Sequence, residues 1–469
     1  MDKELLIRIT DWMNDHRADI VRDLSRLVKI RSVSTYDEPP APFGQGVKLA
    51  LDEALALGVE KGFAARNYED YCGSLCITDE PPFIGFCGHL DVVPEGGNWI
   101  FKPFDPIEKD GFLIGRGVTD NKSAVVGAMY VISCLAELGT PLRHNLKLFL
   151  GCDEEHGMAD VAYYSANYPN PELTLIPDSE FPAAFGEKGI LEADVVADQS
   201  LSDDVVSFAG GVASNVVPEI ATCVLRSSER VDRAMANLPD SVTASRDGDI
   251  VTLTAIGKAA HSAYPVKGVN AIGLLTRALV DTHALRREDE RIFAFIAKIN
   301  DTTTGDAIGI AGVDDLSGAL TCAGTRAGIR NGRMWLHLNI RYGVRSKGGD
   351  LLALMKERCE PEGFSLEVIR DSAPAYFPRE NPIVDTLTDV FNEISGKHLK
   401  PFVMSGGTYA RKLPNALGFG LGGLDQPTPE WMIAGHGGVH EPDEALYIDS
   451  YLKALVIFAM GVVAVDAML

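Results

Sequence analysis

Histidines and acidic residues follow several short apolar runs of this chain, and side chains of these types could bind metal ions. In GHLDVVP, His89 and Asp91 come directly after the apolar run FIGFC. Residues two apart in a strand point to the same side, so both side chains should project from a strand end, where α/β proteins build their sites. Asp91 could then orient the ring of a metal-binding His89. A structural role would explain this pair alone equally well.

Two further acidic clusters occupy similar positions. In GRGVTDNKS, Asp120 opens an expected helix. An aspartate there is often an ordinary N-cap, but its two oxygens could also bridge two cations. In GCDEEHG, three successive carboxylates follow the apolar run LKLFLGC. They either form a solvated acidic turn or lie near the core, where carboxylates without partners are costly and cations would compensate them. Glu154 and Glu155 could then serve as general base and metal ligand.

Two later residues complete the set of candidate ligands. Asp178 ends the predicted strand in LTLIPDSEF, and His440 lies in AGHGGVHEPDE, where His436 is a competing candidate. Each signal has an ordinary structural explanation when it is taken alone. Together they offer two histidines and several carboxylates, a mixture that suits zinc, manganese or cobalt better than calcium or magnesium. Such a set could form a dinuclear site that activates one water molecule.

The elements that must position these residues alternate between strands and helices. Apolar runs predict strands over residues 74–78, 83–87, 146–151 and 173–176, and an amphipathic pattern predicts a helix over residues 122–138. This alternation favours an α/β catalytic domain with a mainly parallel sheet and flanking helices.

The middle of the chain has a different pattern, which indicates a second domain. Alternating strands, such as 251–256 and 334–340, are mixed there with helices, whereas further motifs appear after residue 400. We therefore expect an α+β lid domain inserted into a discontinuous catalytic domain. The expected boundaries are 1–185 for the first catalytic part, 186–384 for the lid and 385–469 for the second catalytic part.

Composition and charge narrow the functional classes. The 469 residues are 46% hydrophobic, enough for two to three domains. A formal net charge of -23 argues against nucleic acid and anionic membranes as partners. Eight cysteines without a Cys-x-x-Cys pair are typical of thiols in a reducing cytosol. The longest apolar run, 454–465, is too short to span a bilayer, so a soluble cytoplasmic protein is expected.

A set of ordered motifs resembles one known family, the dinuclear zinc peptidases that include aminoacylases, carboxypeptidase G-type enzymes, succinyl-diaminopimelate desuccinylase and carnosinase. The motifs are GHLDVVP, GRGVTDNKS, DEE, PDSEFP, AAHSAYP and HEPDE, and they cover essentially the whole chain. The likeness is greatest to the bacterial dipeptidase V type, the Xaa-His or β-Ala-Xaa dipeptidases. That likeness depends on GEKG after PDSEFP, on GKAAHSAYPVKGVNA and on SGGTYAR.

The resemblance implies two divalent metal ions per chain, expected to be Zn²⁺, with Mn²⁺ or Co²⁺ as alternatives. It implies that Asp120 bridges the two ions. His89 and Asp178 would complete the ligands of one ion, and Glu155 and His440 those of the other. No expected ligand is missing from the sequence, which argues against an inactive relative.

The resemblance also implies roles beyond the metal ligands. Glu154 would be the general base, and Asp91 would support His89. His261, in AAHSAYP, would reach the active site from the lid and stabilise the oxyanion. The implied substrate-binding residues are Asn215, Arg341, Thr408 and Arg411. From its position in LHLNIRYGV alone, Arg341 would be taken for a surface strand residue.

The expected function is a metal-dependent dipeptidase that hydrolyses short peptides with a free C-terminal carboxylate. An N-acyl amino acid deacylase with the same metal site is the alternative. A nucleotide-dependent enzyme is disfavoured, because prolines follow the G-x-G-x-x-G spacing at Gly418, Gly420 and Gly423 where an opening helix is needed. An intact Glu154 argues against a non-catalytic binding protein. The resemblance also implies a monomer, with a dimer as the alternative, because some relatives dimerise through the lid and the larger lid of the dipeptidase V type replaces that partner surface.

Overall fold

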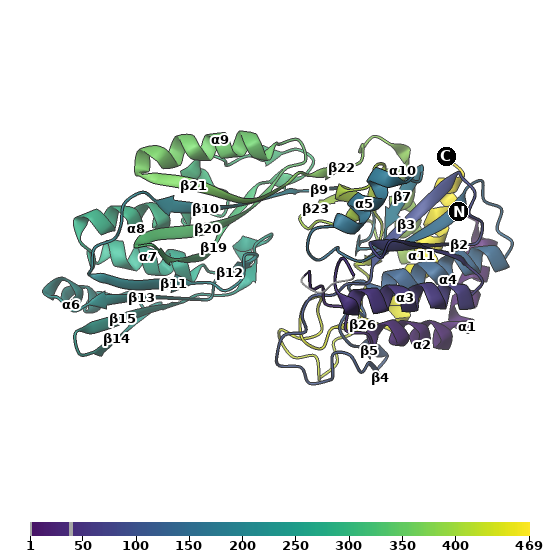
Figure 1. The fold of residues 1–469 in the computed structure, drawn as a ribbon, viewed down its shortest axis with the longest axis horizontal. Coiled ribbons are helices and arrows are strands. Elements are labelled where there is room, and N and C mark those ends of the chain that lie inside the picture. The colour runs from purple at the N-terminus through teal and green to yellow at the C-terminus, as the bar shows by residue number, and fades with distance from the viewer. Residues whose placement is uncertain (1, 37–40) are drawn as a thin grey trace. The chain divides into compact units, whose positions relative to one another are not determined.

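The computed structural model describes residues 2–36 and 41–469, and the chain divides into two compact units (Figure 1). Unit 1 comprises Met1–Gly186, Tyr376–Phe402 and Gly407–Leu469, and unit 2 comprises Glu187–Ala375 and Val403–Gly406. Unit 1 is therefore discontinuous in sequence. The domain boundaries expected from the sequence stay a prediction, because compactness alone does not show which segments fold independently.

A mixed sheet forms the centre of unit 1. Within the described part of the chain it has nine strands in the order β1-β2-β6-β3-β7-β24-β9-β22, with β23 paired to β9. Its strands are β1 (Ala64–Tyr68), β2 (Cys72–Cys76), β3 (Phe83–His89), β6 (Asn145–Gly151), β7 (Leu173–Ile176), β9 (Ala184–Glu187), β22 (Ala375–Tyr376), β23 (Phe402–Met404) and β24 (Ala416–Gly418). The four central strands β6, β3, β7 and β24 run parallel, and β1 and β2 are antiparallel.

The central strands form where the sequence has continuous apolar runs. Phe86, Cys87, Leu148 and Leu150 are all fully buried. Strands that are covered on both faces read as unbroken apolar runs rather than as alternating patterns. The α/β prediction with flanking helices is therefore confirmed, with antiparallel strands added at the edge of a parallel centre.

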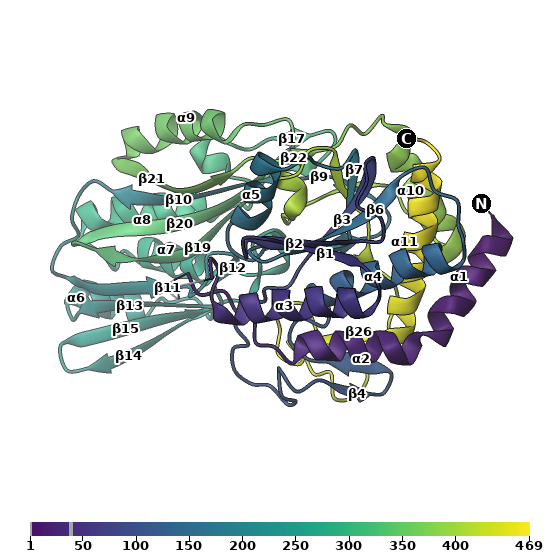
Figure 2. The same ribbon diagram turned by 45° about the vertical axis from the view of Figure 1, so that its right-hand side comes forward.

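Helices cover this sheet. They are α1 (Lys3–Asp15), α2 (Arg17–Val28), α3 (Gln45–Glu60), α4 (Lys122–Glu137), α5 (Ala159–Asn167), α10 (Pro382–Ser395) and α11 (Ile448–Asp466). Helix α4 packs on β3 and β6, and α11 packs against α1, α4 and α10 (Figure 2). A Cβ atom on Gly127 of α4 would come within 2.5 Å of the Leu455 side chain, so the glycine lets α4 and α11 pack closely.

Helix α11 is, among the described residues, the one helix long and apolar enough to cross a membrane. However, 72% of its most apolar window is buried inside the structure, which is typical of a core helix. The same described residues contain no disulfide, and all eight cysteines are buried thiols.

Two small sheets lie beside the main sheet of unit 1. One has the order β26-β5-β4, formed by β4 (Ile107–Lys109), β5 (Phe112–Ile114) and β26 (Ala445–Tyr447). The other pairs β8 (Ser179–Glu180) with β25 (Leu421–Gly422). Each joins segments that are more than 200 residues apart in the sequence, so both bring late residues beside early ones.

Unit 2 is built on an antiparallel sheet of eight strands, counted over the described residues, in the order β14-β15-β13-β11-β19-β20-β10-β21. The strands are β10 (Gly189–Ala197), β11 (Val205–Gly210), β13 (Ile220–Arg226), β14 (Val242–Asp247), β15 (Ile250–Ile256), β19 (Thr321–Arg330), β20 (Arg333–Tyr342) and β21 (Phe364–Ser372). Smaller pairs join β12 (Val216–Val217) to β16 (Ala260–His261) and β17 (Val313–Asp314) to β18 (Gly318–Ala319).

The helices of unit 2 cover the apolar face of its sheet. They are α6 (Glu229–Met235), α7 (Ala271–Asp281), α8 (Arg287–Ile299) and α9 (Gly348–Cys359). In β20, Leu336, Leu338 and Ile340 join the hydrophobic core with residues from these helices. Because side chains alternate along a strand, Asn339 and Arg341 point to the opposite face. This arrangement confirms the α+β character predicted for the inserted segment.

The packing of α11 yields a stability prediction. Leu455 is fully buried, whereas Leu49 in α3 is 49% exposed. Leu455→Ala should lower the free energy of unfolding by about 2–5 kcal/mol, because the lost side chain leaves a cavity in the core. The matched control Leu49→Ala should change it by no more than about 0.5 kcal/mol. Urea unfolding measures both, and equal effects would contradict the core role of α11.

Candidate metal centre

The strand ends and neighbouring loops of unit 1 bring the predicted metal ligands together. His89 is the last residue of β3, Glu155 lies in the turn after β6, and Asp178 lies just after β7. Asp120 lies two residues before the start of α4, and His440 lies in the loop before β26. Parallel strands end at the same edge of a sheet, which is why residues from separate motifs meet there.

The carboxylate of Asp120 lies between the two histidines. Its Oδ1 is 3.0 Å from His89 Nε2, and its Oδ2 is 3.0 Å from His440 Nε2. Glu155 Oε1 lies 3.2 Å from the same nitrogen of His440. On the other side, Asp178 Oδ2 lies 3.8 Å from His89 Nε2. The two oxygens of the Asp120 carboxylate thus face different histidines, Oδ1 facing His89 and Oδ2 facing His440.

Two overlapping groups of side chains are spaced closely enough to hold a cation. One consists of His89, Glu154 and Asp178, and the other of His89, Asp120 and Glu155. Within each group the potential ligand atoms all lie within 4.8 Å of one another. The mixture of imidazole nitrogen and carboxylate oxygen suits a transition-metal ion or zinc.

Burial and crowding shift the proton affinities of this cluster in the metal-free protein. Burial raises the pKa of Glu154 well above its usual value, and the nearby Asp178 carboxylate raises it further. Burial also raises the pKa of Glu155. Burial alone would lower the pKa of His440, but its contacts with Asp120 and Glu155 raise it to about 10. A cation would relieve the repulsion among these carboxylates.

Asp91 lies beneath the cluster and is fully buried. Its Oδ1 accepts the backbone N–H of Glu154 at 3.2 Å, and its Oδ2 accepts that of Glu155 at 3.1 Å. The Nδ1 atom of His89 lies 2.9 Å from the backbone carbonyl of Asp91 and 3.4 Å from its carboxylate. Asp91 therefore contacts the ring of His89 and also holds the turn that carries Glu154 and Glu155.

Sequence analysis did not single out Asn121 or Tyr409. The buried side chain of Asn121 accepts the backbone N–H of His89 at 3.2 Å and donates to Asp178 Oδ1 at 2.9 Å, so it joins the ends of β3 and β7. The hydroxyl of Tyr409 donates to Asp160 at 2.6 Å. Asp160 accepts the backbone N–H groups of Cys152 and Asp153, in the turn after β6. The only feature of the sequence that could have pointed to either residue is the position of Asn121 directly after Asp120.

The remaining predicted residues of unit 1 have local contacts. Thr408 is buried, and its hydroxyl accepts the backbone N–H of Ala410 at 3.2 Å. Thr408 and Arg411 flank Tyr409, which contacts the turn after β6 through Asp160. The competing candidate His436 lies 2.5 Å from a carboxylate oxygen of Asp443, whereas His440 lies 3.0 Å from Asp120 Oδ2; neither histidine belongs to the two ligand groups.

Unit 2 places three predicted residues in one hydrogen-bonded region. The backbone carbonyl of Asn215 accepts the N–H of Ser262, the residue after His261. The hydroxyl of Ser262 donates to Asn339 Oδ1 at 2.9 Å, and Arg341 Nε donates to the same oxygen at 3.0 Å. Arg341 is therefore part of a buried polar network, not an exposed strand residue as its local pattern would indicate.

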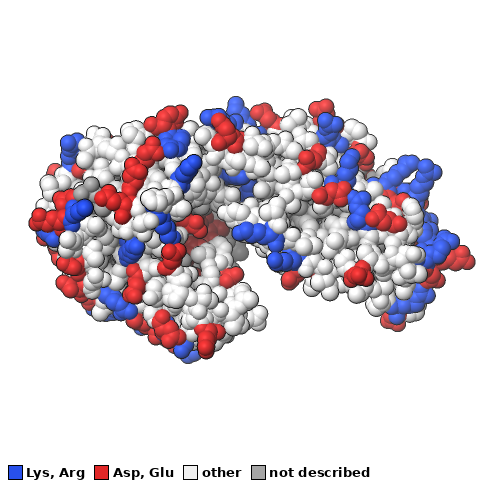
Figure 3. Space-filling model, turned by 180° about the vertical axis from the view of Figure 1, so that it is seen from behind, with Lys and Arg blue, Asp and Glu red and all other residues white. Residues whose placement is uncertain are grey.

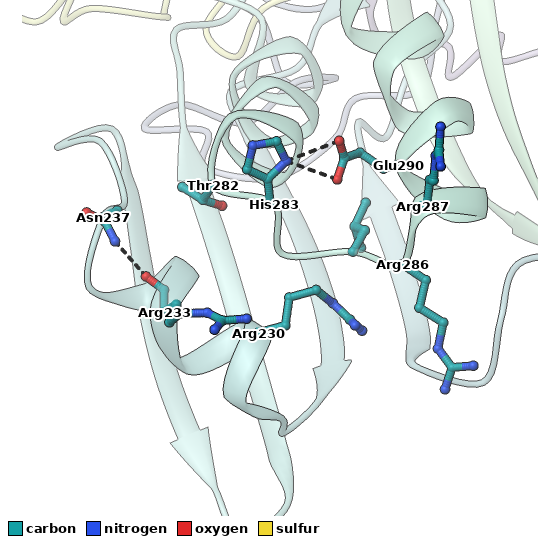
Figure 4. Close-up of a pocket in the computed structure, with 9 residues that line it drawn as sticks. Arg230, Arg233, Asn237, Thr282, His283, Arg286, Arg287 and Glu290 are labelled. Carbon is teal, nitrogen blue, oxygen red and sulfur yellow. Dashed lines mark hydrogen bonds and ion pairs between the residues drawn. The ribbon is translucent and has the colours of Figure 1, made fainter.

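A separate arginine-rich pocket of about 550 Å³ lies in unit 2 (Figure 4). Its lining includes Arg230 and Arg286, which both form ion pairs with Asp204, and His283, which contacts Glu290 at 3.2 Å. It contains none of the predicted catalytic, metal-binding or substrate-binding residues. It is therefore not part of the candidate site.

Comparison with known proteins defines the class of this chain. Residues 85–462 match the family described as "Peptidase family M20/M25/M40", and the chain belongs to this family. It is therefore a peptidase, a hydrolase of peptide bonds. Membership implies the binding of divalent metal ions, for which the groups around His89 offer candidate ligands.

Individual relatives extend over nearly the whole chain. A putative dipeptidase of Bacillus subtilis is 28% identical over 466 residues, covering 95% of this chain and 97% of that protein. The Beta-Ala-Xaa dipeptidase of Lactobacillus delbrueckii subsp. lactis is 28% identical over 459 residues, covering 94% and 95%. The crystal structure of human carnosine dipeptidase 1 has the same fold, with a TM-score of 0.58, 16% identity and 99% coverage of both chains. The family resemblance inferred from the motifs is confirmed.

The clustered ligands predict metal-dependent stability that increases with pH. Zn²⁺ should raise the Tm, by the equivalent of about 2.7 kcal/mol when free zinc exceeds Kd 100-fold. The rise should be larger at pH 7.5 than at pH 6, because His440, with a pKa of about 10 in the metal-free protein, must lose its proton to become a ligand. Thermal unfolding with buffered zinc measures this.

Asp120→Asn should abolish most of that rise in Tm, whereas Asp52→Asn, an exposed change in α3, should retain it. A zinc response that is the same in both variants, or that decreases between pH 6 and pH 7.5, would contradict a metal site around Asp120.

Proposed function

We propose that this peptidase is a dipeptidase that uses two divalent metal ions and Glu154 as general base to hydrolyse short peptides with a free C-terminal carboxylate. The observation that carries the proposal is the position of Asp120, whose two oxygens each lie 3.0 Å from a different histidine. A carboxylate in this position is suited to bridge two cations. The names of the two full-length relatives, both dipeptidases, support the substrate class.

The proposed ligand assignment divides the cluster into two sets that share Asp120. His89 and Asp178 would hold one ion, and Glu155 and His440 would hold the other. The distances of 3.8 Å between His89 and Asp178 and 3.2 Å between Glu155 and His440 support these pairings. Zn²⁺ is proposed, with Mn²⁺ or Co²⁺ as alternatives, because all three accept mixed nitrogen and oxygen ligands.

When bound, the ions would supply Lewis-acid chemistry and lower the pKa of a water molecule. Glu154 would take the proton of this water at its carboxylate and later give it to the leaving amine. Asp91 would keep Glu154 in place through the backbone N–H bonds described above.

The remaining predicted residues are proposed to hold the substrate. His261 would donate a hydrogen bond to the oxyanion that forms from the scissile carbonyl. An arginine fork matches a carboxylate geometrically, and Arg341 would bind the C-terminal carboxylate in this way. The proposed contacts to the remaining substrate atoms come from Asn215, Thr408 and Arg411.

The proposed partner is a small peptide, with neither nucleic acid nor membrane as partner. Figure 3 supports this proposal, because acidic and basic side chains are interspersed on the face that it shows and no extended basic patch appears there among the described residues. The protein is proposed to act as a cytoplasmic monomer, with a dimer as the alternative.

Replacement of the general base is the direct test. Glu154→Gln should lower kcat by about 100-fold to 10,000-fold, because the amide cannot accept the proton of the water. It should still bind about two metal ions per chain, measured by elemental analysis of the purified protein. Glu393→Gln, an exposed change in α10, serves as the control and should retain full activity. Near wild-type turnover in Glu154→Gln would refute the assignment.

A substrate panel separates the dipeptidase from the deacylase. Dipeptides, including Xaa-His and β-Ala-Xaa sequences, should have higher kcat/KM values than N-acetyl and N-succinyl amino acids. Amidation of the C-terminus should lower kcat/KM by about 10-fold to 100-fold, because it removes a charged hydrogen bond to arginine. If an N-acyl amino acid exceeds every dipeptide, the enzyme is a deacylase instead.

A further inference from the structure

A buried carboxylate outside the proposed mechanism holds the loop that carries Asp120. Glu444 is 0% exposed, and each of its oxygens accepts two hydrogen bonds. Its Oε1 accepts the backbone N–H groups of Thr119 at 2.8 Å and Asp120 at 2.9 Å. Its Oε2 accepts the backbone N–H of Gly117 at 3.0 Å and Nη1 of Arg116 at 2.7 Å. All four partners are donors, so only an ionised carboxylate satisfies this site.

Arg116 extends the same contact toward the other metal-ligand loop. It is 1% exposed and forms a buried ion pair with Glu444. Its Nη2 donates to the backbone carbonyl of His440 at 3.4 Å and to that of Glu95 at 3.5 Å. Its guanidinium also lies over the ring of Trp99, 5.2 Å from the centroid. These contacts with a carboxylate, two carbonyl groups and an aromatic ring hold the guanidinium of Arg116 in one position.

The backbone keeps these two loops adjacent. Strand β26 pairs antiparallel with β5, with Ala445 opposite Ile114. The backbone N–H of Gly115 donates to the carbonyl of Glu444 at 2.9 Å, and Thr119 Oγ1 donates to the carbonyl of Ala445 at 3.2 Å. The segment that leaves β5 leads to Asp120, and the segment that enters β26 comes from His440. Glu444 therefore lies at the point where backbone hydrogen bonds hold the loop of Asp120 beside the loop of His440.

We infer that Glu444, held by Arg116, is a positioning residue that fixes the separation of Asp120 and His440. In the structure, His440 Nε2 lies 3.0 Å from Asp120 Oδ2. Asp120 and His440 are metal ligands under the proposed function, so this role rests on it. Glu444 and Arg116 together act mainly on the ion held by Glu155 and His440. They act less on the ion held by His89 and Asp178, since Asn121 joins those two residues separately.

A buried ion pair is weak evidence for stability, because desolvation of the two charges offsets much of their attraction. Removal of only one charge is costly, however, and disturbs the groups that it had organised. In Glu444→Gln, the amide NH₂ group would face N–H donors instead of accepting from them. The loop that carries Asp120 would then shift, and residues that orient metal ligands typically change metal affinity by about 10-fold to 100-fold when they are replaced.

The test measures both metal affinities separately. Metal-free Glu444→Gln is titrated with Co²⁺ in competition with a chelator. The ion held by Glu155 and His440 should bind about 10-fold to 100-fold more weakly, and the ion held by His89 and Asp178, which shares Asp120, should lose clearly less affinity. Glu444→Asp retains the charge but has a shorter reach, so it should show the same change to a smaller extent. It also keeps the test decisive if Glu444→Gln fails to fold, because unchanged affinity for the ion held by Glu155 and His440 in Glu444→Asp would overturn the inference.

Asp466→Asn is the matched control for a purely structural role. Asp466 is also buried, accepts the backbone N–H groups of Arg143 and His144, and lies near the start of β6, at the end away from the ligands. This variant should lower the Tm but leave both metal affinities intact. If Glu444→Gln behaves like it, or weakens both ions equally, Glu444 has no selective positioning role.

Measurements on the wild-type protein distinguish a failure of this inference from a failure of the proposed function. Two Co²⁺ ions per chain and dipeptide hydrolysis in the wild type would leave only the role of Glu444 to be judged from the variants. Fewer than two ions in the wild type would refute the dinuclear site, and the positioning inference would fail with it.

Discussion

Carboxylates are concentrated at the ends of the apolar strands of unit 1, and the arrangement of the candidate site depends on how their negative charge is compensated. His89, Asp120, Glu155 and Asp178 lie at the edge of a sheet whose central strands are mostly apolar. Negative charges in such a place are costly unless donors or cations compensate them. The histidines and backbone N–H groups compensate part of this charge, as the raised pKa of His440 illustrates. Divalent ions would compensate the remaining charge. The carboxylates that repel one another in the metal-free protein are therefore also suited to bind cations.

Much of the catalytic sheet could be predicted from sequence because its central strands are buried on both faces. The expected strand over 146–151 corresponds to β6 (Asn145–Gly151), and the one over 173–176 to β7 (Leu173–Ile176). Likewise, the expected helix over 122–138 corresponds to α4 (Lys122–Glu137). Continuous apolar runs of this length are typical of such strands. The antiparallel addition of β1 and β2 could not be predicted, since strand order depends on contacts between distant segments.

The candidate site was predictable to the extent that each ligand ends or follows a local pattern. Asp120 stands at a helix start and Asp178 at a strand end, and the sequence shows both positions directly. The contacts of Tyr409 with Asp160 and of Glu444 with Arg116 join residues more than 200 positions apart. Hydrophobic periodicity carries no information about such pairs. A single sequence therefore indicated the candidate ligands and Asp91 beside His89, but not Tyr409 or Glu444, which come from distant segments.

The discontinuity of unit 1 has a consequence for the newly made chain. His440 and Glu444 are translated about 260 residues after Asp178, with all of Glu187–Ala375 in between. At ordinary rates of synthesis this interval lasts roughly 15 to 50 seconds. Until it ends, the growing polypeptide has only part of the ligand set, and β24 and α11 have not yet joined the sheet and helices of the first segment. A ribosome-bound chain would therefore be unable to hydrolyse peptides until its final segment has been synthesised.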